Sequence, residues 1–273
     1  MTERRIIIAL IVLVVSAVIA PYAVGWALSR PVRADIGPPP ASLDAEPVAF
    51  SNQSGAVIHG WLSPAPSARG SVLLLPGVWA NRLSMVRRAE FLRQAGYSTL
   101  LIDFQATGES EGLNTRTPGR PIGIIGVSLG GAAALLAAPS LHVDAVVLEA
   151  VYPSIDRAVV NRLGARLGPL GKLAAPLLLL QLRSRLGVAA ADLKPVDHIA
   201  QLGCPILVIA GTADRSTTPE DTQLLFVAAR GPKELWMIPG AAHTDLLEFA
   251  GDAYRQRILA FFATALVQRT TDR

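Results

Sequence analysis

Three residues that lie far apart in the chain have side chains that could together perform nucleophilic catalysis. Ser128 lies at the centre of the segment 126–130, GVSLG, which matches the pattern G-x-S-x-G, and Asp214 and His243 follow it in that order. A serine hydroxyl is a weak nucleophile until an imidazole accepts its proton and a carboxylate orients that imidazole. The three residues therefore predict a Ser-His-Asp triad that transfers an acyl group to water.

The surroundings of Ser128 support this interpretation more than the letters of the motif do. An apolar strand is expected over 122–127, and a helix rich in Ala and Leu is expected over 129–138. This strand–turn–helix order is the setting of a nucleophile elbow, a turn so sharp that the residues two before and two after the serine must be small. Gly126 and Gly130 occupy those two positions.

Asp214 and His243 each follow a predicted strand, over 205–210 and 234–238. The carboxyl ends of parallel strands lie at one edge of a sheet, so we expect both residues at the same edge as Ser128.

Other roles for these residues remain open at this point. The motif could be an ordinary glycine-rich turn, and His243 could be a loop histidine. Asp214 could cap the helix that begins near Pro219. Glu149, at the end of the strand over 145–150, is the best substitute for the acid, and His198 is expected to pack or to cap a helix.

The rest of the chain alternates apolar strands with helical patterns. An antiparallel hairpin is expected from 48–50 and 57–62, with its turn at Ser54-Gly55. Further strands are expected over 71–76, 97–103, 122–127, 145–150, 205–210 and 234–238, and helices over 85–95, 129–138, 219–229 and 252–264. This alternation predicts an α/β fold with a mostly parallel sheet that is covered by helices on both faces.

One stretch, 152–203, interrupts the alternation and is rich in Leu, Ala and Arg. It is expected to form a small helical cap inserted between two strands. Its apolar run over 175–182 could be core, line an acyl pocket or contact lipid.

The chain resembles the α/β-hydrolases of the serine-aminopeptidase-like, ABHD13/BEM46-like group. The matching segments are LLLPGVWANR, DFQATGESEG, GIIGVSLGG, PILVIAGTADRSTTPE and PGAAHTDLL, and the likeness extends from about Val48 to the C-terminus. The resemblance implies the α/β-hydrolase fold and the triad Ser128, Asp214 and His243. It also implies an oxyanion hole formed by the backbone N–H groups of Leu129 and of Val78 or Trp79.

Two features depart from the pattern of that group. Its members usually have His before the Gly of the oxyanion loop, where this chain has Pro76. They also have a helix between the positions of Asp103 and Ser128, for which the segment 113–120 has neither the length nor the pattern. Asp103 itself is expected to be structural and to hold the adjacent GESEG loop.

The N-terminal run 6–28 contains no charged residue and is long enough to cross a bilayer as a helix. We therefore expect a single-pass membrane anchor over 1–29, a Pro-rich linker over 30–47 and a hydrolase domain over 48–273. Arg4 and Arg5 favour an N-terminus in the cytoplasm and an extracytoplasmic catalytic domain. A cleaved signal peptide is the alternative.

Composition excludes several other classes of protein. Charged residues make up 17% of the chain, the net charge is +4 and no block of like charges occurs, so no nucleic-acid partner is expected. Cys204 is the single cysteine, and the four histidines lack metal-binding spacing, so neither a disulfide within the chain nor a metal site is predicted.

The function expected from these features is that of a serine hydrolase without a cofactor. It would cleave an ester, thioester or similar acyl bond in a small or lipid-like molecule. A peptidase and a non-catalytic binding module of the same fold are the alternatives.

Overall fold

The computed structural model describes residues 5–8, 19–20, 22–23, 26, 32–51, 57–66, 68–104, 107–108 and 121–266. The chain divides into two compact units. One consists of Pro31–Pro153 and Pro195–Arg273, and the other of Met1–Arg30 and Ser154–Lys194. The predicted domain boundaries remain predictions, as does the role of 152–203 as a cap.

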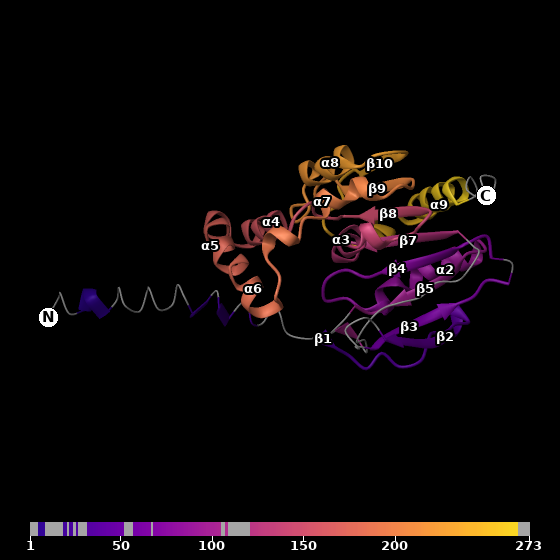
Figure 1. The fold of residues 1–273 in the computed structure, drawn as a ribbon, viewed down its shortest axis with the longest axis horizontal. Helices are drawn as coiled ribbons and strands as arrows, with labels where there is room; N and C mark the ends of the chain where they lie inside the picture. Colours follow the sequence, from indigo (N-terminus) through magenta and orange to yellow (C-terminus); the bar gives the residue numbers. More distant parts are fainter. Residues whose placement is uncertain are drawn as a thin grey trace. The chain divides into compact units, whose positions relative to one another are not determined.

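The larger unit is built on an eight-stranded sheet (Figure 1). Its strand order is β10-β9-β8-β7-β4-β5-β3-β2. The strands are β2 (Glu46–Ser51), β3 (Val57–Ser63), β4 (Ser71–Leu75), β5 (Ser98–Ile102), β7 (Ile122–Val127), β8 (Ala145–Glu149), β9 (Ile206–Gly211) and β10 (Lys233–Ile238). The six strands from β10 to β5 are parallel to one another, whereas β3 is antiparallel to both β2 and β5. The predicted mostly parallel α/β sheet and the antiparallel hairpin are confirmed.

The central strands are apolar because they are buried, and this is why apolar runs in the sequence predicted them. Every residue of β8 and β9 is buried, as expected for central strands that are covered on both faces.

The second, two-stranded sheet pairs β1 (Val32–Arg33) with β6 (Thr107–Gly108). Short 3₁₀ helices connect the larger elements: η1 (Ala41–Leu43), η2 (Arg82–Met85), η3 (Ala138–Ser140), η4 (Ala190–Asp192) and η5 (Ile199–Gln201).

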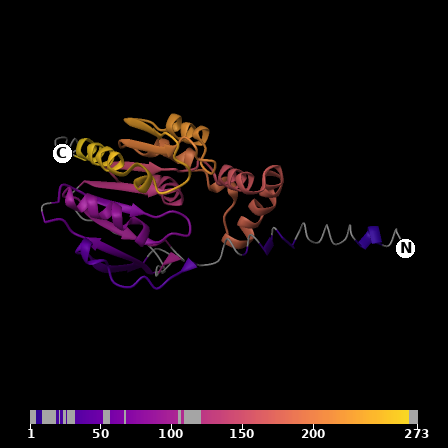
Figure 2. The same ribbon diagram turned by 180° about the vertical axis from the view of Figure 1, so that it is seen from behind.

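The helices of the larger unit form two groups (Figure 2). Helices α2 (Val86–Gln94) and α9 (Leu246–Ala265) contact each other, and α3 (Leu129–Leu136), α7 (Pro195–His198) and α8 (Pro219–Ala228) form the second contiguous group. The first group covers the main core, where Tyr97 and Phe262 pack with ring centroids 6.0 Å apart. Aromatic pairs of this kind add about 0.5–1.5 kcal/mol to the free energy gained from burial.

Helix α9 begins earlier than the sequence predicted. Asp245 caps it by accepting hydrogen bonds from the N–H groups of Leu247 and Glu248 at 2.9 and 3.3 Å. The helix is kinked at Gly251, whose backbone has φ 55° and ψ −122°. The predicted helix over 252–264 is therefore the part beyond the kink, because a glycine in a helical pattern reads as a boundary.

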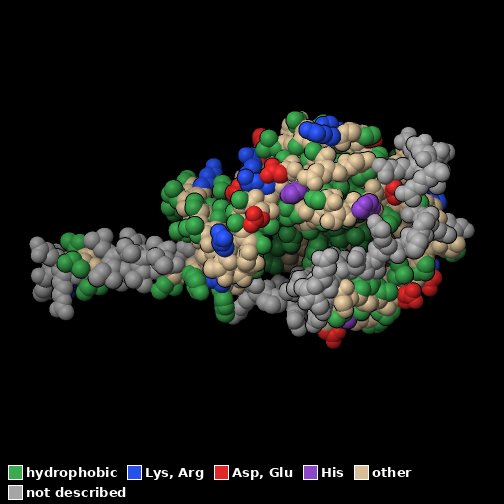
Figure 3. All heavy atoms as spheres, viewed as in Figure 1, with side chains coloured by type: hydrophobic (Ala, Val, Ile, Leu, Met, Phe, Trp, Pro, Cys, Tyr) green, Lys and Arg blue, Asp and Glu red, His purple; other side chains and the backbone are tan. Residues whose placement is uncertain are grey.

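The α-helices α4 (Ile155–Leu167), α5 (Pro169–Leu179) and α6 (Gln181–Leu186) lie in the smaller unit. Helices α4 and α5 pack closely, and a side chain at Gly171 would overlap the carbonyl group of Leu163. Leu170, Leu173 and Leu180 are 72%, 75% and 76% exposed. Figure 3 shows hydrophobic and basic side chains side by side on the surface of these helices.

The predicted N-terminal membrane anchor, and the membrane localisation that depended on it, are corrected by the structure. A helix needs about 20 consecutive apolar residues to cross the hydrocarbon core of a bilayer. Within the described residues, no helix is both long and apolar enough to do so. Much of the run 6–28 lies outside the described residues, as do Ser54-Gly55 and the segment 113–120.

We predict that Gly251→Ala lowers the free energy of unfolding by about 1–3 kcal/mol, because L residues are strained at the backbone angles of the kink. No atom lies within 4 Å of the added methyl group, so a steric clash is not the cause. Gly203→Ala is the matched control, since that glycine also has open space but no positive φ. Equal losses of stability in urea unfolding would contradict a strained kink at Gly251.

Candidate active site

Ser128 lies between β7 and α3 in a backbone conformation that is unusual for a residue with a side chain, φ 49° and ψ −107°. Such strained residues cost about 1–3 kcal/mol and cluster at functional sites. Its N–H donates to the Glu149 carbonyl oxygen at 2.7 Å, and its own carbonyl accepts from the Ala132 N–H at 3.0 Å. The Ser128 side chain is buried and does not cap α3.

The glycines beside Ser128 leave no room for a side chain. A Cβ atom at Gly126 would lie 2.5 Å from the Gly131 Cα atom, and one at Gly130 would overlap the Leu75 carbonyl oxygen. Gly131, which the sequence analysis did not single out, is equally restricted, because its Cβ would overlap the side chain of Val151. The close contact between β7, β4 and the start of α3 explains Gly126 and Gly130, whereas the segment after β8 explains Gly131.

Asp214 and His243 form a hydrogen-bonded pair, with 2.7 Å between Asp214 Oδ2 and His243 Nδ1. The Asp214 carboxylate is fully buried, whereas the His243 side chain is 27% exposed. The other carboxylate oxygen, Oδ1, accepts from the N–H groups of Ser216 and Thr217, each at 2.8 Å. These bonds hold the carboxylate so that one oxygen faces the imidazole.

A path of hydrogen bonds connects this pair to the Ser128 turn. The N–H of Ser128 is bound by Glu149, and the next residue, Ala150, accepts from the Thr217 hydroxyl at 3.1 Å through its carbonyl oxygen. Thr217 also donates its N–H to Asp214. The ends of β7, β8 and β9 are therefore joined in one network.

The structure gives other contacts to the residues and roles that the sequence left as alternatives. Helix α8 is capped by Thr218, which forms a capping box with Asp221, so Asp214 does not cap it. Glu149 is buried and accepts hydrogen bonds from Arg88 and Tyr254. His198 lies at the end of α7, where its Nδ1 is 3.5 Å from Gln201 Nε2.

The loop after β4 contains the predicted oxyanion residues Val78 and Trp79. The N–H of Ala80 donates to the Gly77 carbonyl oxygen at 3.2 Å, and Trp79 has a φ of 60°. These features define a type II turn, whose third residue requires a positive φ. A Cβ placed on Gly77 would lie 3.9 Å from the Ser128 Cβ atom, so this turn is beside the nucleophile elbow.

Arg82 and Asp103 form a buried ion pair that the sequence analysis missed. The Asp103 carboxylate also accepts from the Arg82 backbone N–H at 2.7 Å, and the guanidinium lies 4.7 Å from the centre of the Trp61 ring. Asp103 was expected to hold the GESEG loop, of which residues 109–112 lie outside the described residues, so that role stays a prediction. Through Arg82, Asp103 anchors the end of the loop that begins at Pro76, the position where the resembling group usually has a histidine.

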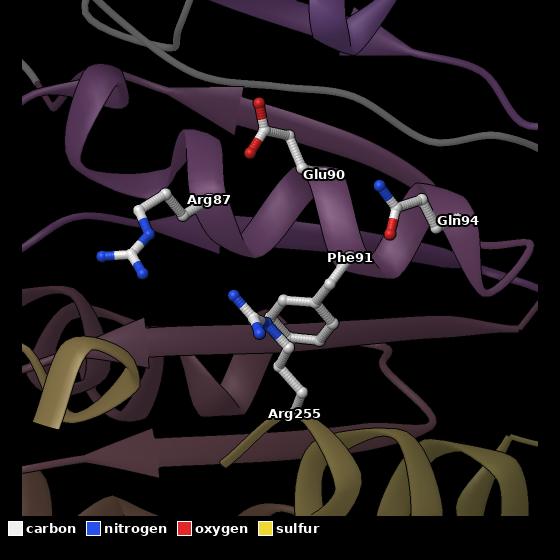
Figure 4. A pocket seen from close by; sticks show the side chains of 5 residues that line it. All are labelled: Arg87, Glu90, Phe91, Gln94 and Arg255. Atoms are coloured by element: carbon white, nitrogen blue, oxygen red, sulfur yellow. The ribbon is translucent and has the colours of Figure 1, made fainter. Parts of the chain in front are cut away.

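A separate hollow of about 280 Å³ lies between α2 and α9, lined by Arg87, Glu90, Phe91, Gln94 and Arg255 (Figure 4). None of the predicted site residues contributes to its lining. Figure 4 shows the side chains of Glu90 and Gln94 pointing away from α9. This hollow is therefore distinct from the candidate active site.

We predict that Trp79→Gly is at least as stable as Trp79→Ala. At an ordinary position alanine is favoured over glycine by about 0.4–1 kcal/mol, because glycine gives the unfolded chain more freedom. At a φ of 60° the alanine Cβ is strained and this order reverses. Urea unfolding of the two variants measures the difference, and a clearly more stable alanine variant would contradict the type II turn.

Comparisons with known proteins extend these observations. No family model matches the chain. It is 26% identical to the uncharacterized protein YfhR of Salmonella typhi, over 96% of this chain and 97% of that one. It is also 26% identical to the alpha/beta hydrolase domain-containing protein WAV2 of Arabidopsis thaliana, over 89% of this chain and 85% of the relative.

Solved structures with a similar fold include two esterases. The Pyrococcus furiosus esterase Pf2001 superimposes with a TM-score of 0.69 at 16% identity, covering 87% of this chain and 99% of that one. The Exiguobacterium antarcticum esterase gives a TM-score of 0.61 at 14% identity, covering 80% and 100%. Membership of the narrower ABHD13/BEM46-like group remains a prediction. From its sheet and these likenesses, the chain has the α/β-hydrolase fold.

Proposed function

We propose that the protein is a serine hydrolase that cleaves an ester, thioester or similar acyl bond. Ser128 is the nucleophile, His243 the general base and Asp214 the residue that orients the imidazole. The observation that carries the proposal is the strained Ser128 turn, whose hydrogen bonds lead through Glu149, Ala150 and Thr217 to the Asp214–His243 pair.

The reaction has two acyl-transfer steps. Ser128 Oγ attacks the substrate carbonyl carbon while His243 accepts the hydroxyl proton, and the proton then passes to the leaving group as the acyl bond breaks. A water molecule attacks the resulting acyl-enzyme, with His243 again accepting a proton and returning it to Ser128. Asp214 stabilises the imidazolium in both steps without taking the proton.

The oxyanion formed in each step needs hydrogen-bond donors that are already in place. We assign this role to the backbone N–H groups of Leu129, at the start of α3, and of Val78 or Trp79, in the type II turn. One such donor contributes about 2.7–4 kcal/mol to the stability of the transition state. Because the donors are backbone groups, Pro76 in place of histidine does not remove them.

Ester substrates are favoured by the names of the structural neighbours from Pyrococcus furiosus and Exiguobacterium antarcticum, which are esterases. The chemistry assigned to the triad requires no cofactor. A small-molecule acyl substrate is therefore the first class to test.

We predict that a fluorophosphonate probe labels the wild-type protein and that Ser128→Ala abolishes the labelling. Ser140→Ala is the matched control, because Ser140 is exposed in η3 and has no assigned role. Labelling is measured by in-gel fluorescence, and a thermal melt of each variant verifies folding. A folded wild-type protein that is not labelled would contradict a serine hydrolase and favour a non-catalytic binding module.

The acyl specificity is measured with p-nitrophenyl esters of increasing chain length, beside aminoacyl p-nitroanilides. Hydrolysis of the esters with Ser128-dependent kcat supports the proposal. Ser128-dependent hydrolysis of the anilides alone would identify a peptidase instead.

Asp214→Asn is expected to lower kcat by roughly 10³–10⁴-fold, because an amide does not stabilise the imidazolium and favours the wrong tautomer. The asparagine oxygen can still accept from the N–H groups of Ser216 and Thr217, so the structure of the loop is retained. Ester hydrolysis under saturating substrate measures the effect. Activity within tenfold of the wild type would remove Asp214 from the assigned role.

A further inference from the structure

Four polar side chains, three of them buried and the fourth, Asp245, 34% exposed, form a cluster behind the candidate active site. Arg88 comes from α2, Glu149 from the end of β8, and Asp245 and Tyr254 from the cap and body of α9. Arg88, Glu149 and Tyr254 are 2%, 1% and 0% exposed. Charged side chains are rarely buried to this degree unless they are paired.

Arg88 uses its whole guanidinium group to bind both carboxylates. Towards Glu149, Nη2 donates to Oε2 at 2.8 Å and Nε to Oε1 at 3.2 Å. Towards Asp245, Nη2 donates to Oδ1 at 3.0 Å and Nη1 to Oδ2 at 3.3 Å. The two acceptors are thus held on a planar group of fixed shape, which a lysine could not reproduce.

Tyr254 completes the cluster. Its hydroxyl donates to Glu149 and accepts from Arg88 Nε at 3.1 Å. Burial raises the pKa of Tyr254, so the hydroxyl stays protonated and remains a donor. Although burial opposes ionisation of both groups, the charge interactions prevail, raising the pKa of Arg88 and lowering that of Asp245. Both therefore stay charged at neutral pH.

At one end, Glu149 connects the cluster to the turn that contains Ser128. Glu149 binds Arg88 through its carboxylate, and through its backbone carbonyl it accepts the Ser128 N–H at 2.7 Å. A shift of the Glu149 side chain would move the backbone that holds the strained serine.

At the other end, Asp245 connects the cluster to the loop that contains His243, the proposed general base. Asp245 follows His243 by two positions and caps α9. On the preceding side of His243, the Ala241 carbonyl oxygen accepts from the Ala213 N–H at 2.9 Å. The His243 loop is thus held to the segment that follows β9 before the histidine, and to Arg88 after it.

We propose that Arg88 is a positioning residue that sets the spacing between the Ser128 turn and the His243 loop. It does so by binding Glu149 on one side and Asp245 on the other. This inference rests on the proposed hydrolase function. A buried ion pair is often no more stabilising than an apolar replacement of the same volume, so stability alone does not account for the cluster.

Asp245→Asn is the most informative variant, because Asn caps a helix as well as Asp does. It retains the α9 cap but removes the charge that binds Arg88. We expect kcat per folded protein to fall by about 10–100-fold, the size of effect that small misplacements of reacting groups produce. We expect KM to change less than twofold, and the rate of fluorophosphonate labelling to fall in parallel with kcat.

Glu234→Gln is the matched control for the loss of a carboxylate that binds an arginine. Glu234 on β10 binds Arg257 of α9 at 2.7 Å, and both side chains are exposed. This variant is expected to retain the wild-type kcat, KM and labelling rate.

Arg88→Lys provides a second test, alone and combined with Asp245→Asn. If both residues act through their contact, the double variant loses much less activity than the product of the two single losses. A multiplicative loss, or an Asp245→Asn variant with the wild-type kcat per folded protein, would overturn the inference. Failure of the proposed function is distinguishable, since the wild-type protein would then not be labelled.

Discussion

The backbone at Ser128 has a conformation that a residue with a side chain adopts only at a cost of about 1–3 kcal/mol, so surrounding elements must hold it there. The absence of side chains at Gly126, Gly130 and Gly131 lets β4, β7 and the start of α3 approach one another closely. The end of β8 then binds the Ser128 N–H. The strained turn thus depends on the packing of four elements, β4, β7, β8 and α3. Residues far from it in the sequence therefore determine whether it forms.

Buried charge pairs occur on both sides of this turn. Arg82 binds Asp103 beside the loop after β4, while Arg88 binds Glu149 and Asp245 next to the segments that contain Ser128 and His243. In each case an arginine from η2 or α2 binds a carboxylate at the end of a strand, Asp103 directly after β5 or Glu149 as the last residue of β8. Since loops have few apolar contacts to order them, directional hydrogen bonds from a rigid guanidinium are an effective way to hold them.

The sequence was sufficient for the features that depend on local patterns. Apolar runs predicted the strands, small residues around Ser128 predicted the elbow, and the order of strand ends predicted that Asp214 and His243 would meet. The burial of Arg82 and Arg88 could not be predicted, because arginine side chains are mostly solvent-exposed. The positive φ of Trp79 and the early start of α9 also depend on contacts beyond the local sequence. The anchor expected from hydropathy over 6–28 was wrong, since no helix in the described part of the chain is both long and apolar enough to cross a bilayer.

The charge cluster also has a consequence for how the protein matures. Glu149 leaves the ribosome about 100 residues before Asp245 and Tyr254 do, and Arg88 leaves it about 160 residues before them. A nascent chain thus contains the whole nucleophile motif while the carboxylate behind it still lacks part of its binding partners. Docking of α9 is the step that completes the cluster. A chain truncated by premature termination or cleaved before Tyr254 would carry the serine motif without the assembled environment around it.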